Sequence, residues 1–264
     1  MGQQVYNLRL KMNLTEQEIE RYSRNIILPE IGGAGQKKLL ASKVLIIGIG
    51  GLGSPVLMYL AASGVGNITI VDNDKVDLSN LQRQVIHNTS EIGNTKVSSA
   101  KKFIKNINPA INIIEINDKI TERNVEELIK KNHIVADGSD NFKTRYLVSD
   151  ACFRLNKTLV SAAITKFEGQ ISTWKKSPIA LPCFRCLFPK EPDNSELNNC
   201  SANGVLGSVA GFLGSIQATE VVKEILGIGK SLAGFLNIYD LLNNNFRTLK
   251  INKDPNCSFC SKEN

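Results

Sequence analysis

The sequence predicts an α/β fold with a Rossmann-like, doubly wound, mainly parallel sheet, an antiparallel end and a zinc site made of four cysteines. Up to about residue 159, short apolar strands alternate with helical segments, which is typical of a parallel sheet. A glycine-rich turn at 48–53 joins the first of these strands to a helix. Beyond residue 159, strand-like segments follow one another and two C-x-x-C pairs appear, which predicts the antiparallel end and the metal site.

Local signals place the elements in order. Thr15 and Glu18 match a capping box, so a helix is expected from there to about Ile27, with Pro29 ending it. Further helices are expected at 55–63, 95–107, 124–131, 142–153 and 205–226. Strands are expected, in one continuous sheet, at 44–47, 68–71, 111–116, 133–136, 159–162, 169–174, 234–239 and 246–251. A long loop is expected at 178–203, which is rich in proline and asparagine.

Composition sets broad limits on the class of protein. The 264-residue chain has 42% hydrophobic and 22% charged residues, which is ordinary for a globular protein in water. Its formal net charge of +7 is compatible with nucleic-acid binding, an acidic partner or anionic substrate, or lysines spread over solvated faces. No signal peptide is visible, and the most apolar stretch, 205–216, has only 12 residues. These features predict a cytoplasmic protein without a membrane span.

The glycine motif Gly48-x-Gly50-x-x-Gly53 stands between a strand and a helix, the context of a nucleotide-binding turn. Glycines there let the backbone approach a phosphate, and the helix N-terminus offers amide donors. Asp72 follows the next strand, 19 residues beyond Gly53, where an acid can bind ribose hydroxyls. The motif predicts a nucleotide site without separating NAD from ATP, and a glycine turn without a ligand is the plainer alternative.

A polar segment at 77–84 follows the second strand, at the edge where doubly wound sheets bind ligands. Arg83 suits phosphate oxygens, Asn80 and Gln84 are its polar neighbours, and Lys96 adds a second positive charge. ATP needs such cations because its charge must be neutralised as pyrophosphate leaves, whereas a dehydrogenase does not need them. The alternative is that Arg83 and Lys96 are solvated surface charges.

The segment 137–141 follows another strand at the same edge of the sheet. The Asp140 carboxylate is suited to an Mg²⁺ ion that bridges phosphates. Asp140 or Asn141 is equally suited to cap the helix that follows, and the two roles are compatible.

Together these segments resemble the bacterial ThiF/MoeB/HesA family, relatives of ubiquitin-activating enzymes that adenylate a Gly-Gly carboxyl terminus. The resemblance covers about 14–260 and rests on 21–25 (Arg-Tyr-Ser-Arg-Asn), the glycine turn, 79–84 (Ser-Asn-Leu-Gln-Arg-Gln), Lys96 and 140–141. It implies one adenylation domain across 1–264. Within it we expect an N-terminal helical segment at 1–42, a nucleotide-binding core at 43–163 and a zinc- and carrier-binding part at 164–264.

The resemblance also implies roles for individual residues. The expected catalytic residues are Arg24, Arg83, Asp140 and Cys200. Arg24 is expected to reach into the site of a partner subunit, which makes the active unit a homodimer. The residues expected around ATP and Mg²⁺ are Gly51, Asp72, Ser79, Asn80, Leu81, Gln82, Arg83, Gln84, Lys96, Asp140 and Asn141.

Four of the six cysteines form the pairs Cys183-x-x-Cys186 and Cys257-x-x-Cys260, separated by 70 residues. Two such pairs predict a closed, tetrahedral, structural Zn²⁺ site. Redox pairs and disulfides are the alternatives, but neither pair is expected to begin a helix in a βαβ unit and no export signal is visible. The resemblance agrees, because its members carry a zinc that fixes the C-terminus to the domain.

The other two cysteines have different surroundings. Cys152 lies among apolar residues of a predicted helix and is expected in the core. Cys200 lies in a polar loop before a helix, where the pKa of a thiol tends to fall. The resemblance places Cys200 where related enzymes keep a thioester cysteine, so it is either a nucleophile that captures the carrier or a spare loop thiol. His87 is expected to be structural and His133 to lie near the surface.

The predicted function is ATP-dependent adenylation of the C-terminal glycine carboxylate of a ubiquitin-like sulfur carrier, which primes thiocarboxylate formation. The carrier belongs to the molybdopterin-synthase or the thiamine-thiazole pathway. Because no rhodanese-like segment follows Cys260, a separate sulfur donor, a cysteine desulfurase or a rhodanese, is expected. The rival interpretations are adenylation of a peptide terminus, an NAD-dependent oxidoreductase and a zinc-stabilised nucleic-acid-binding module.

Overall fold

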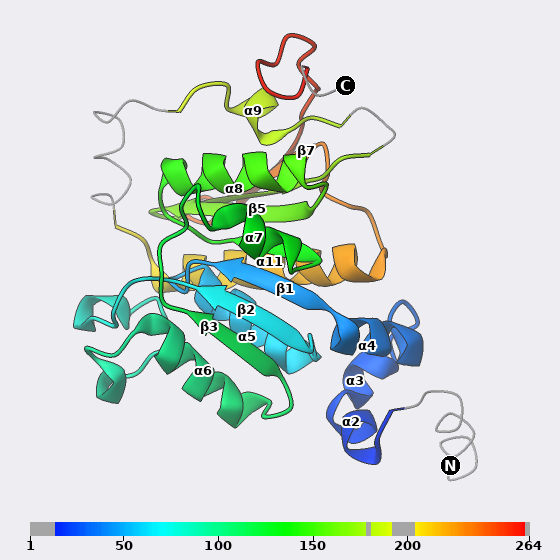
Figure 1. Cartoon of the computed structure of the whole chain (residues 1–264), viewed down its shortest axis with the longest axis vertical. Coiled ribbons are helices and arrows are strands. Elements are labelled where there is room, and N and C mark those ends of the chain that lie inside the picture. Colours follow the sequence, from blue (N-terminus) through cyan, green and yellow to red (C-terminus); the bar gives the residue numbers. More distant parts are fainter. Residues whose placement is uncertain (1–13, 178–180, 192–203, 262–264) are drawn as a thin grey trace.

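One sheet runs through the residues that the computed structural model describes, 14–177, 181–191 and 204–261 (Figure 1). Its strand order is β3-β2-β1-β4-β5-β6-β7-β8. The first five strands in this order pair in parallel, whereas β6, β7 and β8 pair antiparallel. Their bounds are β1 (Lys43–Ile47), β2 (Asn67–Val71), β3 (Asn112–Ile116), β4 (Ile134–Asp137), β5 (Thr158–Thr165), β6 (Glu168–Trp174), β7 (Phe235–Asp240) and β8 (Asn245–Lys250). The predicted doubly wound sheet with an antiparallel end is confirmed.

Helices cover both faces of the sheet. One face carries α4 (Gly32–Ala41), α5 (Gly53–Ser63), α6 (Lys96–Ile107) and α11 (Gly207–Leu226). The other face carries α7 (Val125–Lys130), α8 (Phe142–Arg154) and the one-turn α9 (Phe184–Leu187). The short helices α2 (Glu16–Arg21) and α3 (Ser23–Ile26) lie far from α9 and the C-terminal turn (Figure 1). None of the described helices combines the length and apolar character needed to cross a membrane.

The central strands are apolar because both of their faces are covered. In β1, four consecutive residues after Lys43 are buried, and β4 is buried throughout. Alternate side chains enter different clusters: Ile46 packs in the cluster that contains α5 and α11, and Leu45 in the cluster that contains α7 and α8. A shift of register by one residue would exchange these two sets, so the double burial fixes the register.

The register also brings three loops to one edge of the sheet. Ile47 pairs with Val71 of β2 on one side and with Asp137 of β4 on the other. Parallel strands end at the same edge, so the segments that leave β1, β2 and β4 begin next to one another. The glycine turn, Asp72 and the segment 138–141 are therefore neighbours.

Two local expectations were wrong, and one helix was not predicted. The helix expected up to Ile27 is broken at Tyr22, whose side chain is buried and whose hydroxyl accepts a hydrogen bond from Asn108 Nδ2 at 2.8 Å. Helix α4 was not expected from its glycine-rich sequence, yet it forms because Gln36 and Leu39 are buried against the rest of the fold. The loop expected at 178–203 contains α9.

Candidate active site and cysteine cluster

The glycine turn is a close-packed junction between β1 and α5. Gly48 has a φ of +81°, and a Cβ on Gly53 would lie 1.9 Å from the Gly48 carbonyl oxygen, so only glycine fits there. The amide of Ile49 donates to Asp72 Oδ2 at 2.7 Å. Asp72 thus fastens the turn to the end of β2. Each carboxylate oxygen can accept a second hydrogen bond, so the predicted contact with ribose remains compatible with this role.

The segment predicted to bind phosphates begins with the 3₁₀ helix η1 (Leu78–Asn80). Asp77 accepts from the Ser79 amide at 2.8 Å, and Asn80 Oδ1 accepts from the Asp77 amide at 3.2 Å. These two hydrogen bonds form a capping box, which fixes the shape of the loop that leads to Arg83. Arg83 Nη1 donates to the Ser79 carbonyl at 2.9 Å, and a Cβ on Gly51 would lie 3.6 Å from Arg83 Cγ. The stem of Arg83 therefore lies beside the glycine turn, as predicted.

The remaining residues of this segment surround the same turn. Gln84 is buried, and a Cβ on Gly50 would lie 3.7 Å from its Nε2 atom. The Lys96 side chain is 8% exposed, and its ammonium donates to Asp74 Oδ2 at 2.8 Å. Gln82 Nε2 donates to the Val205 carbonyl at 3.5 Å, close to the start of α11. Leu81, the last of the predicted set here, is half-buried.

The segment after β4 combines a buried and an exposed carboxyl group. Asp137 is 1% exposed and Asp140 is exposed. Burial raises the pKa of Asp137 above the ordinary carboxyl value, and the charge of Arg145 partly opposes that rise. Asn141 Oδ1 accepts from the Thr144 amide at 2.9 Å, so Asn141 is the residue that caps α8. Within the described residues, the Asp140 side chain accepts one hydrogen bond, from Asn141 Nδ2 at 3.4 Å, and Asp140 is otherwise exposed to solvent.

Within the described part of the chain, three buried oxygens near the turn have no hydrogen-bond partner: Gln84 Oε1, Asp137 Oδ2 and Ser139 Oγ. Buried polar atoms are nearly always satisfied, so unpaired acceptors or donors indicate a place for water or a polar ligand. All three belong to segments that adjoin the glycine turn. The residues of this edge therefore fit a bound nucleotide, with amide donors from the turn and cationic side chains from Arg83 and Lys96.

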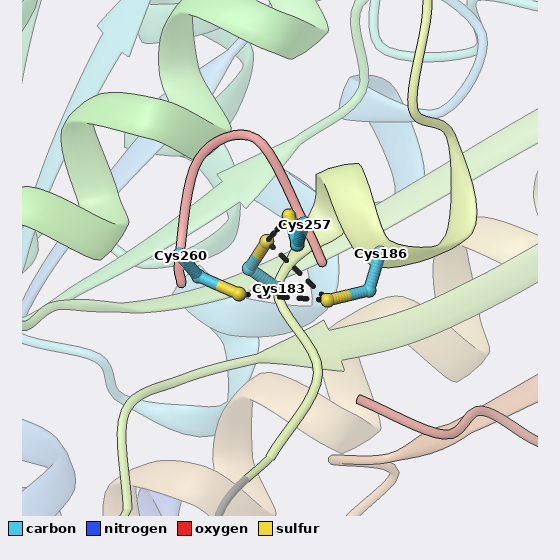
Figure 2. Close-up of side chains that lie close together, drawn as sticks. All are labelled: Cys183, Cys186, Cys257 and Cys260. Carbon is cyan, nitrogen blue, oxygen red and sulfur yellow. Dashed lines mark hydrogen bonds between the residues drawn. The ribbon is translucent and has the colours of Figure 1, made fainter. Parts of the chain in front are cut away.

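The four cysteines of the two C-x-x-C pairs converge (Figure 2). Cys183 Sγ lies 3.8 Å from Cys186 Sγ and 3.7 Å from Cys257 Sγ, and Cys186 Sγ lies 3.6 Å from Cys260 Sγ. A tetrahedral ion with Zn–S bonds of about 2.3 Å places its thiolates about 3.8 Å apart. The cluster therefore has the dimensions of a tetrahedral thiolate site, and all four thiols are free of disulfides.

The cluster joins two distant parts of the chain. Cys183 precedes α9, which is not part of a βαβ unit, and the other pair lies in the C-terminal turn. Arg185 of α9 makes a two-pronged ion pair with Asp150 of α8, with N–O distances of 2.9 and 2.8 Å. Tyr146 of α8 packs edge-on against Phe184 of α9. A metal ion here would fix the C-terminal turn to a helix that is itself anchored on α8.

A sequence model of the ThiF family matches residues 22–259. The chain belongs to the ThiF family. It is 42% identical over 255 residues to the sulfur carrier protein adenylyltransferase of Thermus thermophilus, covering 96% of this chain and 94% of that protein. It is also 42% identical over 253 residues to the SAMP-activating enzyme E1 of Haloferax volcanii, covering 96% and 93% of the two chains. The crystal structure of Escherichia coli MccB with ATP shares the fold, with a TM-score of 0.81, 24% identity and coverage of 92% and 75%.

One predicted site residue of this ThiF-family chain lies away from the others. Arg24 is on α3, which contacts α4, and α4 leads into the start of β1 rather than its end (Figure 1). Arg24 is exposed, and within the described ranges it forms no hydrogen bond or ion pair. The glycine turn follows the opposite end of β1. Arg24 therefore lies away from the nucleotide edge of its own chain, which is the edge of the sheet that carries the glycine turn, Arg83, Lys96 and Asp140.

The two cysteines outside the cluster differ in what the structure says of them. Cys200 lies outside the described residues, so its role stays a prediction. Cys152 is 1% exposed, as predicted for a core residue, and burial raises the pKa of its thiol.

Arg145 was not expected to take part in this site, whereas His87 was expected to be structural without a named partner. Arg145 donates from Nε and Nη2 to the Ser139 carbonyl at 3.1 and 2.7 Å. His87 is buried against the carbonyl of Ile49. Both act on main-chain groups, which leave no pattern in the sequence, so no motif could have pointed to them.

Proposed function

We propose that this chain uses ATP to adenylate the C-terminal glycine carboxylate of a small ubiquitin-like sulfur carrier that ends in Gly-Gly. The observation that carries the proposal is the meeting of the glycine turn, Arg83, Lys96 and Asp140 at one edge of the sheet. Two relatives matched over nearly their whole length, named a sulfur carrier protein adenylyltransferase and a SAMP-activating enzyme, support it. No feature of the described residues favours the oxidoreductase or nucleic-acid-binding alternatives over this reaction.

In the proposed reaction, a carboxylate oxygen of the carrier bonds to the α-phosphorus of ATP. The bond from that phosphorus to the bridging oxygen of the β-phosphate breaks, and pyrophosphate leaves with the electron pair. Two anions must meet, so the site has to lower their repulsion and hold them in line. Arg83 and Lys96 would stabilise the phosphate charge, and amides of the glycine turn would hold phosphate oxygens.

Two metal ions belong to the proposal. Asp140 would hold Mg²⁺, because it is an exposed carboxylate at the nucleotide edge. Mg²⁺ would supply charge neutralisation for the phosphates. Zn²⁺ would be held by Cys183, Cys186, Cys257 and Cys260, where it would have a structural role.

The finer proposals concern partners. A separate sulfur donor would convert the acyl-adenylate to a thiocarboxylate, in the molybdopterin-synthase or the thiamine-thiazole pathway of the cytoplasm. Arg24 would serve the site of a second subunit in a homodimer. The part at 164–264 would bind the carrier. It carries three aromatic rings, of which Phe212 and Phe246 are exposed, and the ring centroid of Phe246 lies 5.6 Å from that of Tyr239 and 6.3 Å from that of Phe212.

The test is carrier-dependent exchange of labelled pyrophosphate into ATP. Arg83→Ala and Asp140→Ala should each lower the exchange rate by roughly 10² or more, because each removes a group that stabilises transferring charge. Lys143→Ala, which removes an exposed cation from the first turn of α8, should exchange like the wild type. Exchange at the wild-type rate in both Arg83→Ala and Asp140→Ala would refute the assignment.

A further inference from the structure

Both main-chain groups of Ser139 are held by side chains. Its amide donates to Asp137 Oδ1 at 2.9 Å. Its carbonyl accepts from Nε of Arg145 at 3.1 Å and from Nη2 at 2.7 Å. Asp137 is 1% exposed and Ser139 is 7% exposed, so water competes little for these bonds. Asp137 at the end of β4 and Arg145 of α8 thus hold the Ser139 peptide from two sides.

These hydrogen bonds to Ser139 determine where the next residue, Asp140, lies. Asp140 has no strong side-chain contact of its own, since its one described bond, to Asn141 Nδ2, is 3.4 Å long. Its carboxylate is therefore placed by the backbone on either side. Asn141 is fixed by its cap on α8, and Ser139 is fixed by Asp137 and Arg145.

The same segment is packed against the glycine turn. A Cβ on Gly138 would lie 3.2 Å from the Gly53 amide nitrogen, and a Cβ on Gly48 would lie 3.1 Å from the Gly138 carbonyl oxygen. A shift of the Ser139 peptide would therefore move Asp140 relative to the turn or press the two loops together.

Among the described residues, the hydrogen bonds of Arg145 all go to this single carbonyl, while its charge also acts on the buried Asp137 carboxyl group. Arg145 lies 5.8 Å from the ring centroid of Phe142, and within the described ranges it forms no ion pair. A guanidinium can direct two parallel N–H groups at one acceptor, whereas a lysine ammonium on a flexible stem has no such fixed fork. The arrangement therefore restrains the direction of the Ser139 carbonyl as well as its distance.

We propose that Arg145, acting with Asp137 through the Ser139 peptide, is a positioning residue that aims the Asp140 carboxylate at the divalent cation of the nucleotide. The inference rests on the proposed function, in which Asp140 holds that cation. Changes in residues that orient a metal ligand typically cost 10- to 100-fold in metal affinity or activity. Loss of the guanidinium should therefore raise the demand for Mg²⁺ more than it lowers the maximal rate.

The experiment compares Arg145→Met, Arg145→Lys and Arg154→Met in pyrophosphate exchange over a range of Mg²⁺ concentrations. Arg145→Met should raise the Mg²⁺ concentration for half-maximal exchange by about tenfold, with a smaller loss at saturating Mg²⁺. Arg145→Lys should fall between Arg145→Met and the wild type. Arg154→Met removes an arginine from the last turn of the same helix and should leave the Mg²⁺ dependence unchanged. An unchanged Mg²⁺ dependence in Arg145→Met, with only a lower melting temperature, would overturn the proposal.

A second measurement separates this inference from the proposed function. Hydrogen exchange of the segment 138–141 in the full chain needs no substrate. It should be faster in Arg145→Met than in the wild type and in Arg154→Met, because the Ser139 peptide has lost one of its two anchors. If the wild type shows no pyrophosphate exchange, the proposed function fails, but hydrogen exchange still tests whether Arg145 anchors the Ser139 peptide. Equal hydrogen exchange in all three proteins would refute that role of Arg145.

Discussion

At the scale of single residues, buried side chains hold the peptide groups of the nucleotide edge. His87 is 6% exposed; its Nδ1 lies 2.8 Å from Ser99 Oγ and its Nε2 lies 3.2 Å from the Ile49 carbonyl oxygen. Burial lowers the pKa of His87 below its ordinary value, and Lys96 acts in the same direction. The Ile49 carbonyl and the acidic groups of Asp72 and Glu91 oppose the shift. His87 is therefore a neutral structural group that ties α6 to the glycine turn.

This predicts a loss of stability in acid. The folded-state pKa of His87 is below its unfolded value, so the unfolded chain binds more protons once the pH falls below about 6.5. The free energy of unfolding should then decrease from pH 7.5 to 5.5, with a contribution from His87 of up to about 1.4 kcal/mol. Denaturant unfolding should show a smaller decrease for His87→Gln than for the wild type. His133→Gln, at the other and exposed histidine, should match the wild type, and equal decreases in all three proteins would contradict the account.

The sequence predicted the site residues that follow strand ends, but not the residues that hold their main-chain groups in place. The glycine turn, Arg83 and Asp140 follow strand ends with characteristic spacing, so the pattern predicted that they lie at the same edge of the sheet. The second role of Asp72, as an acceptor for the Ile49 amide, depends on the register of β1 and β2. Arg145 acts on a carbonyl six residues before it, which no residue-type pattern encodes.

At the scale of elements, periodicity predicted the long helices and buried strands but not the pieces that tertiary packing creates. Helix α4 includes Gly32 and Gly35, which disfavour a helix, and a Cβ on Gly35 would press against Ile31 at 3.1 Å. A larger residue at position 35 would require Ile31 to shift, so the packing there favours a glycine that local propensity counts against. Likewise, α9 is a single turn beginning after Cys183, and its neighbours are cysteines from the far end of the chain.

The cysteine cluster leads to a prediction about the element that it anchors. Purified without chelator, the protein should contain one Zn²⁺ per chain, and Cys260→Ser should lose it. Removing the metal frees the C-terminal turn from α9, so the free energy of unfolding should fall by about 3 kcal/mol or more. Metal analysis and denaturant unfolding measure both effects. Cys152→Ala, at a buried cysteine outside the cluster, should keep the full zinc content. Zinc-free wild-type protein with undiminished stability would contradict this prediction.

At the scale of the whole molecule, the position of Arg24 bears on assembly. It lies with α3 at the end of the molecule where β1 begins, whereas the nucleotide edge is where β1 ends (Figure 1). A sequence cannot reveal this, because distance within one chain appears only when the fold is known. A role for Arg24 in the reaction therefore requires a second copy of the chain.

Mixing two inactive variants tests that requirement. Arg24→Ala and Arg83→Ala should each be nearly inactive alone. If the chain forms the proposed homodimer, dissociation and reassembly in equal amounts would make half of the dimers mixed, each with one intact site, so exchange should return to about a quarter of the wild-type rate. Recovery should follow the formation of mixed dimers. Absence of any recovery, with mixed dimers present, would show that Arg24 does not act across the interface.

The most direct test of the central claim follows the phosphates of ATP. The protein is incubated with Mg²⁺, a purified ubiquitin-like carrier ending in Gly-Gly and ATP labelled in either the α- or the γ-phosphate. We expect the α-label to appear on the carrier, as an acyl-adenylate that hydroxylamine cleaves, and the γ-label to appear in pyrophosphate. Label from the γ-phosphate on the carrier or in inorganic phosphate alone, with none from the α-phosphate on the carrier, would contradict it.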